Sequence, residues 1–140
     1  MNSNSGQQRG IHPDEEATIH AFVVKEKKQR YIEMLASPDK RGWFLDVLNH
    51  CRDFDERFIK KVRMDVGVID ELRQRGAPNK CRVISDIKGI DGADLPLAAA
   101  LPLVEEGGWG TILCCLPGRL AYYHDEWGSR RWVLERKPAD

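Results

Sequence analysis

The chain has 140 residues, which suits one domain, and its 41% apolar and 31% charged residues are typical of globular rather than disordered chains. Lys plus Arg and Asp plus Glu number 22 each, so the chain has no net charge and lacks the basic excess of most nucleic-acid-binding proteins. No apolar run approaches the ~20 residues that cross a bilayer, and no apolar signal segment follows the start, so we expect a cytoplasmic protein without membrane contact.

The beginning of the chain differs in composition from the rest. Residues 1–17 are rich in Ser, Asn, Gln and Gly, then in acidic residues, and show no apolar periodicity. We therefore expect a flexible tail there, followed by a single domain over residues 18–137. The apolar run at residues 20–24 is compatible with a short strand or with the start of a helix.

Three segments have the apolar spacing of helices: residues 25–36, a segment from Pro38 to about residue 51, and residues 66–75. The first two are joined by so short a link that they are predicted to pack as a helical hairpin. The segment 53–65 between the second and third helices has no clear periodicity.

The second half of the chain predicts an antiparallel sheet. Strands are expected at residues 81–86, 111–116, 120–123 and 131–135. Pro117-Gly118 predicts a tight turn between the middle two strands, because Pro fixes φ at the second turn position and Gly accepts φ > 0 at the third. Asp94 is expected to cap a helix from Leu95, which Pro102 should kink or end. The predicted fold is α+β, with amino-terminal helices on one face of a three- or four-stranded sheet.

The sequence also resembles a known family between about residues 20 and 136. The residues that carry the resemblance are His20–Val24, Arg30-Tyr31, Val83–Ser85, Ile90–Gly92, Leu95–Leu97, Ala100-Leu101, Gly110–Ile112, Cys115–Gly118 and Leu120–Tyr123. They resemble a family of small uncharacterised bacterial proteins with no assigned activity. The resemblance implies one folded bacterial cytosolic domain and identifies no catalytic residue.

Three tryptophans cluster around the predicted hairpin: Trp109, Trp127 and Trp132. Aromatic side chains are enriched at interaction sites, so one hypothesis is a non-catalytic interaction or regulatory module. Its partner would be another protein or a second copy of the chain, bound through an exposed face or edge of the sheet. The alternative is that these rings form a secondary core under the sheet.

A polar cluster supports a rival hypothesis of a small metal-dependent hydrolase. His124 and Asp125 follow a predicted strand and could serve as acid and base, with Asp86, Asp91 or Asp94 as metal ligands. The alternative is a solvated turn, because charged loop residues are normally exposed. The sequence leaves open whether the protein is an enzyme, and no cofactor motif is present.

The amino-terminal half is locally basic, with Trp43 and Phe44 between its cations. Phosphate contacts beside aromatic rings would suit nucleic acid. However, carboxylates alternate with these cations, so solvated helix faces with i,i+4 ion pairs explain the same residues. We therefore do not expect nucleic acid as a partner.

The four cysteines, Cys51, Cys81, Cys114 and Cys115, do not have the spacing of a zinc site. In a strand, neighbouring side chains point to opposite faces. Cys114 shares its side with uniformly apolar residues, so it is predicted to be buried and Cys115 to be the more exposed thiol. The simpler alternative is that both cysteines are packing residues.

Overall fold

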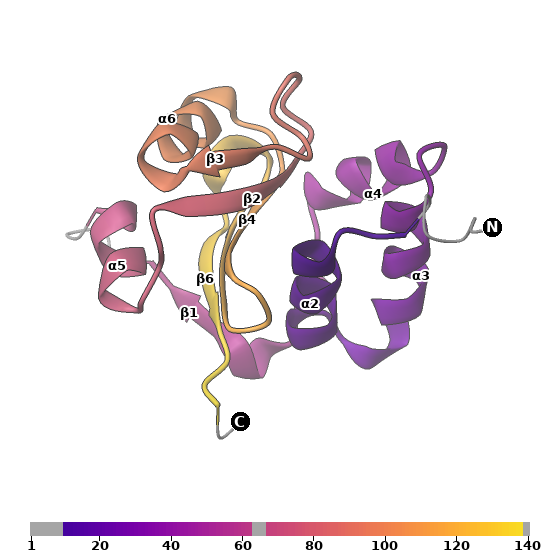
Figure 1. Ribbon diagram of the computed structural model, residues 1–140, viewed down its shortest axis with the longest axis horizontal. Coiled ribbons are helices and arrows are strands. Elements are labelled where there is room, and N and C mark those ends of the chain that lie inside the picture. Colours follow the sequence, from indigo (N-terminus) through magenta and orange to yellow (C-terminus); the bar gives the residue numbers. More distant parts are fainter. Residues whose placement is uncertain (1–9, 63–66, 139–140) are drawn as a thin grey trace.

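The computed structural model describes residues 10–62 and 67–138 (Figure 1). The α-helices of this part are α2 (Pro13–Phe22), α3 (Lys25–Ala36), α4 (Arg41–Leu48), α5 (Val68–Gln74) and α6 (Leu97–Gly107). Its strands are β1 (Ile59–Lys61), β2 (Lys80–Ser85), β3 (Asp94–Pro96), β4 (Thr111–Leu116), β5 (Leu120–His124) and β6 (Arg131–Glu135). Short 3-10 turns at Glu56–Phe58 and Glu126–Gly128 precede β1 and β6.

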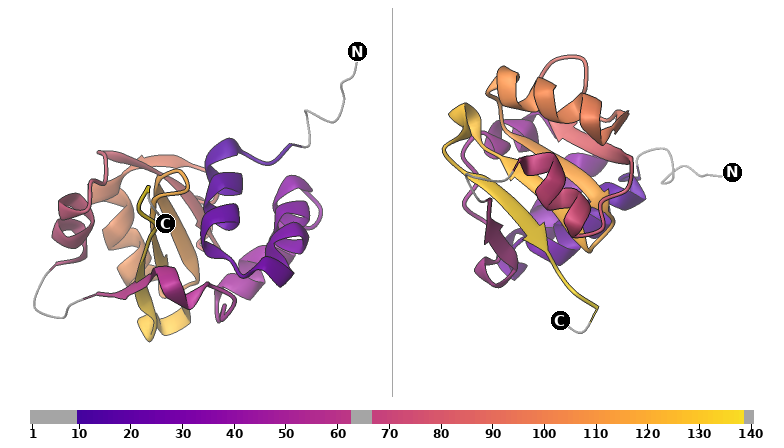
Figure 2. Two further views of the ribbon diagram at one scale, coloured as in Figure 1. Left: turned by 90° about the horizontal axis from the view of Figure 1, so that it is seen from below. Right: turned by 90° about the vertical axis from the view of Figure 1, so that its left-hand side faces the viewer.

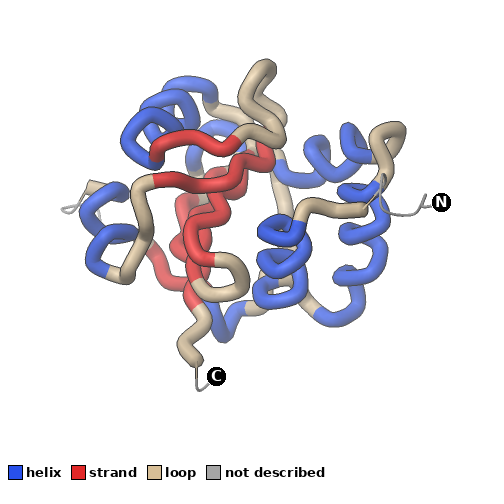
Figure 3. Tube along the Cα trace, in the orientation of Figure 1, coloured by secondary structure: helices blue, strands red, loops and turns tan. Residues whose placement is uncertain are grey.

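The elements form three layers, with the sheet between two groups of helices (Figures 1 and 3). The strands are antiparallel in the order β1-β6-β5-β4-β2-β3. Helices α2 and α4 cover one face, with α3 packed against both of them, and α5 and α6 cover the other face (Figure 2). The predicted α+β class is thus confirmed. None of the helices in the described ranges has the length and apolar character needed to cross a bilayer.

The hairpin predicted around Pro117-Gly118 is present. The backbone N–H of Arg119 donates to the carbonyl of Leu116 at 2.9 Å. Gly118 has φ of +72°, the value that the third position of a type II turn requires and that glycine adopts without steric cost. A register shift between Cys114 and Leu116 places a β-bulge next to this turn.

The sheet is larger than the sequence predicts. It has six strands rather than three or four, because two short segments join its edges. β1 follows the amino-terminal helices and pairs with β6, whereas β3 pairs with β2 by placing Leu95 opposite Cys81. Asp94 therefore begins a strand and is not a helix cap. Helix α6 starts at Leu97 and continues through Pro102.

The helices are also not confined to the amino-terminal half. Helices α5 and α6 cover the second face of the sheet, which the prediction left open. The central strands β4 and β5 are therefore almost wholly buried, whereas β1 and β6 keep partly exposed side chains. Among residues 10–62 and 67–138, β1 and β3 are the edge strands, and each is paired on one side alone.

The expected tail was placed too far into the chain. Helix α2 begins at Pro13, and the N–H of Asp14 donates to Nδ1 of His12 at 3.1 Å, which caps the helix. Glu15 is fully buried, so this acidic segment belongs to the folded domain. Residues 1–9 of the expected tail lie outside the described residues.

Polar contacts join the end of α4 to the sheet. The hydroxyl of Tyr123 donates to the carbonyl of Leu48 at 2.6 Å and accepts from the N–H of Cys51 at 3.0 Å. The N–H of Gly110 donates to Oδ1 of Asn49 at 2.7 Å, in a buried position. These contacts bring the backbone at residues 48–49 against the start of β4.

Candidate functional site

His124, proposed from sequence as an acid or base, ends β5 and is 2% exposed. Its Nδ1 lies 2.8 Å from the carbonyl oxygen of Asp125, and its Nε2 lies 3.1 Å from Oε2 of Glu105. Arg131 also binds Glu105, at 2.7 Å. Both ring nitrogens therefore contact acceptors of the protein itself, which leaves neither directed at an open site.

The acidic candidates have separate structural partners. Asp125 accepts hydrogen bonds from the hydroxyl of Ser129 at 2.8 Å and the N–H of Arg130 at 2.9 Å, and so holds the turn before β6. Asp86 accepts from Nδ2 of Asn49 at 3.0 Å. The expected convergence of these carboxylates with His124 is therefore not found.

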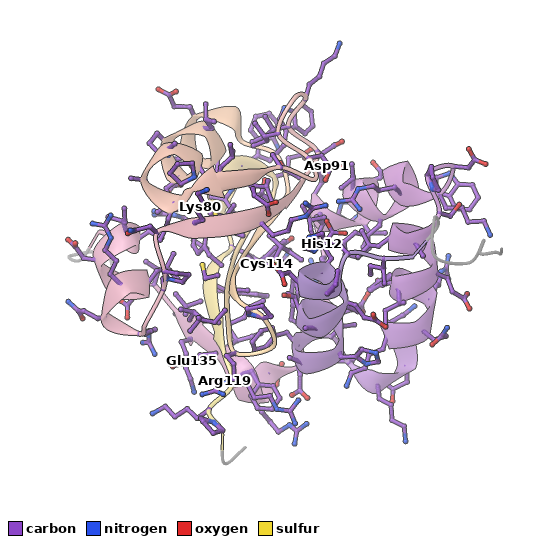
Figure 4. The ribbon with its side chains drawn as sticks, viewed as in Figure 1. His12, Lys80, Asp91, Cys114, Arg119 and Glu135 are labelled. Atoms are coloured by element: carbon purple, nitrogen blue, oxygen red, sulfur yellow. The ribbon has the colours of Figure 1, made fainter. Side chains whose placement is uncertain are left out.

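The two remaining carboxylates belong to an ion network on the other side of the sheet. Asp91 binds Arg41 at 2.7 Å, and Asp94 lies 3.5 Å from Arg82. Figure 4 places Asp91 at the end of the sheet opposite Arg119 and Glu135. Within the described residues, no group of three or more His, Cys, Asp or Glu side chains is placed to hold a metal ion.

The cysteines are buried, with Cys114 and Cys115 only 3% and 5% exposed. The prediction for Cys114 is confirmed: it is buried in the core on the side of the amino-terminal helices, next to Thr18 of α2. The expected sharp difference in accessibility between the two is not found, because α5 and α6 cover the face to which Cys115 points and it is buried as well. Burial raises the pKa of Cys81 to about 11 and those of Cys51 and Cys114 to about 12, and it raises the pKa of Cys115 as well.

We expect a thiol reagent at pH 8 to label none of the four cysteines faster than the protein unfolds, because the native thiols are buried and protonated. Unfolding in urea should release all four. The raised pKa values also predict that stability falls as pH rises above the unfolded thiol pKa of ~8.5, because the unfolded chain then loses protons that the native state retains. Rapid native labelling of Cys115 would contradict the burial described above.

The three candidate tryptophans differ in burial. Trp132 is half-buried and packs against Tyr123 and Phe54, with ring centroids 5.9 and 6.4 Å away. Trp109 and Trp127 are 44% and 82% exposed. The N–H of Trp127 donates to the carbonyl of Gly108 at 2.9 Å, which holds the two exposed tryptophans on neighbouring loops.

Trp127 also has φ of +73°, in the left-handed region that costs a bulky residue roughly 1–2 kcal/mol. The turn from Asp125 to Ser129 therefore presents an exposed ring at a conformational cost. This turn borders a hollow next to β1 and β6.

Two adjoining hollows lie along β1 and β6, with volumes of about 440 and 420 Å³. They share Lys61, Arg130 and Trp132, and we call the pair the edge groove. The other residues of the first hollow are Arg52, Phe54, Glu56 and Ile59, and those of the second are Val62, Gly128, Ser129 and Arg131. The groove thus combines aromatic rings with cations from three different segments.

The charge of the edge groove is unbalanced. Four cations and one carboxylate line it, namely Arg52, Lys61, Arg130, Arg131 and Glu56. Arg131 is paired with Glu105, and Arg130 lies 3.7 Å from Asp125 and 5.8 Å from the centre of the Trp132 ring. In the described ranges, no carboxylate lies within ion-pair distance of Arg52 or Lys61.

Cations continue along the same border of the sheet beyond the edge groove. A third hollow, of about 350 Å³, is lined by Arg57, Phe58, Lys60, Glu135 and Lys137. Arg119 and Arg136 line a fourth at the hairpin turn. Figure 4 shows Arg119 and Glu135 together at this end. Positive charge therefore follows β1 and β6 over their length, although the whole chain is neutral.

Sequence reasoning identified Trp132 as a binding candidate but did not place the cations around it. Arg52, Lys61 and Arg130 come together only through the pairing of β1 with β6, which local periodicity does not reveal. The chain matches no protein-family model, no curated protein and no solved structure. The arrangement of these side chains is therefore the basis for a functional proposal.

Proposed function

We propose that this protein is a cytoplasmic, non-catalytic binding module whose edge groove holds an extended anionic partner. The observation that carries the proposal is the gathering of cations beside half-buried Trp132 in a chain without net charge. Exposed Arg52 and Lys61 lie there without carboxylate partners among the described residues. Unpaired cations that share a concave surface attract counter-ions of opposite charge and steer anionic partners.

Association between sheet edges is less well supported as the mode of binding. β1 and β3 are only three residues long; β1 carries Lys60 and Lys61, and β3 ends in Pro96. Short edge strands with lysine or proline discourage pairing with another strand. The side chains of the groove, rather than the backbone of an edge, are therefore the surface that we assign to the partner.

The rival hydrolase has weaker support. It requires His124 and several carboxylates to converge at an open site. His124 is instead enclosed by Glu105 and Asp125, and Asp91 contributes to an ion network with Arg41. A binding role needs only the charges and rings that the edge groove already combines.

The proposal predicts that exchange of Arg52 and Lys61 for glutamine weakens binding of fluorescently labelled inorganic polyphosphate at least about tenfold. Fluorescence anisotropy at two salt concentrations measures this. Three phosphate contacts, from Arg52, Lys61 and Arg130, predict about 20-fold weaker binding by the unaltered protein between roughly 50 and 200 mM salt. The double variant should depend less steeply on salt.

The matched control also removes two positive charges, but at exposed positions outside the groove. It is the double variant Lys40→Gln with Lys88→Gln. Its affinity for polyphosphate should stay within about twofold of that of the unaltered protein, because direct contacts between cations and phosphates contribute more to binding than the net charge of the protein does. Equal weakening in both double variants, or no binding by the unaltered protein, would refute the assignment of the groove.

A further inference from the structure

We infer that the anionic partner of the edge groove is single-stranded nucleic acid, with a base stacked in the hollow beside Trp132 and phosphates bound by the surrounding cations. This inference rests on the proposed function and names its partner. Proteins that bind single strands without sequence preference combine a positively charged groove with aromatic side chains on which bases stack. The edge groove has both features.

The aromatic part of the site is formed by Phe54 and Trp132. Phe54 is 3% exposed and supports the ring of Trp132 edge-on, with interplanar angle 84°, while half-buried Trp132 lines both hollows. A volume of about 440 Å³ lies in the range of small-ligand sites and can receive a flat base. Trp132 thus packs against the core through Phe54 and still lines the groove.

The cations surround this ring on several sides. Lys61 lies opposite Trp132 in the β1–β6 ladder, Arg130 lies over the ring, and Arg52 lines the same hollow. A base next to Trp132 would therefore have its flanking phosphates within reach of positive charge. A guanidinium can also stack on a base, so Arg130 can contact either part of a nucleotide.

The positive border is long enough for several nucleotides. The extended chain from Arg130 to Lys137 covers about 23 Å at the usual rise of a β-strand. The third hollow, with Lys60 and Phe58, lies toward the far end of this stretch. Guanidiniums of Arg57 and Arg136 lie 5.0 and 4.7 Å from the centre of the Phe58 ring. A strand of about four nucleotides or more would therefore lie along β1 and β6, within the usual site sizes.

An acidic peptide fits the same surface less well. A peptide would add to the sheet through the backbone of an edge strand, with pockets for alternate side chains. β1 offers only Ile59–Lys61 for such pairing, and lysines at an edge discourage it. The partner expected here binds through stacking and phosphate contacts, neither of which needs a long edge strand.

The test compares three labelled probes by fluorescence anisotropy: a thymidine oligonucleotide of about ten nucleotides, an abasic strand of equal length, and polyglutamate. The oligonucleotide should bind at least about tenfold more tightly than the abasic strand, because only the former can stack a base. Trp132→Leu should reduce the affinity for the oligonucleotide to that for the abasic strand. The affinity for the abasic strand itself should not change. Trp43→Leu, at an exposed position on α4, should change neither.

The outcomes separate this inference from the proposed function. Equal affinity for the oligonucleotide and the abasic strand, with both lost in the Arg52 and Lys61 double variant, would overturn base stacking and leave an anion-binding groove. Tighter binding of polyglutamate would also overturn the inference. Binding of none of these probes or of polyphosphate would overturn both proposals. The comparison of oligonucleotide with abasic strand uses the unaltered protein, so it holds even if Trp132→Leu does not fold.

Discussion

Replacing Gly110 with alanine is expected to destabilise the protein by about 4 kcal/mol or more, a large part of the roughly 5–15 kcal/mol by which folded domains are stable. A Cβ atom at this position would lie 2.5 Å from the backbone nitrogen of Asn49 and closer still to the carbonyl group of Leu48. Backbone cannot move aside as a flexible side chain can. The substitution would separate α4 from β4 and weaken the buried hydrogen bond from Gly110 to Asn49.

Gly42 provides the matched control, since the same exchange is made at a glycine in α4 that has nothing within 4 Å of the added Cβ. Gly42→Ala should raise stability by about 0.5–1 kcal/mol, because alanine favours a helix over glycine. Urea denaturation monitored by circular dichroism measures the free energy of unfolding of both variants. If the free energy of unfolding of Gly110→Ala lay within about 1 kcal/mol of that of the unaltered protein, the close approach of α4 to the sheet would be contradicted.

Glu15→Ala is expected to lower stability by about 3–5 kcal/mol, the usual effect of removing one partner from a buried ion pair. Glu15 is fully buried and accepts two hydrogen bonds from Arg41, at 2.8 and 3.0 Å, and one from Arg82 at 3.0 Å. Burial disfavours the charged Arg41, but its hydrogen bonds to Asp91 and Glu15 outweigh this and raise its pKa. Without Glu15, two poorly solvated guanidiniums would compete for Asp91 and Asp94.

The neighbouring acid provides the control for Glu15. Glu16 lies 3.8 Å from His20 in a largely exposed pair, so Glu16→Ala should change stability by less than about 0.5 kcal/mol. If Glu15→Ala proved as mild as Glu16→Ala in urea denaturation, α2 would not depend on this network for its attachment to the sheet.

The contrast between the hairpin and α2 explains what could be predicted from the sequence. The turn at Pro117-Gly118 follows from local backbone preferences, and both flanking strands have apolar residues, so their pairing needs no distant information. Helix α2 begins with acidic residues that are typical of a solvated tail. Its burial depends on Arg41 and Arg82, which lie 26 and 67 residues further along the chain.

The same limit applies to the edge strands and to the candidate site. Three residues such as Asp94–Pro96 carry too little periodicity to identify a strand, and only pairing with β2 makes them one. Strands β2 to β5 lie between Lys61 and Arg130 in the sequence. The two residues become neighbours only when β1 pairs with β6. The zero net charge argued against nucleic acid, but a sum of charges does not describe where they lie.

Nuclear magnetic resonance can test the central claim most directly, through chemical-shift changes when the thymidine oligonucleotide is added to labelled protein. The structure predicts the largest changes at the amides of Lys61 and Arg130 and at the indole N–H of Trp132, with little change around Lys40 and Lys88. Changes concentrated on α3, on α4 or in the loop after β2, with none along β1 and β6, would contradict the edge groove as the binding surface.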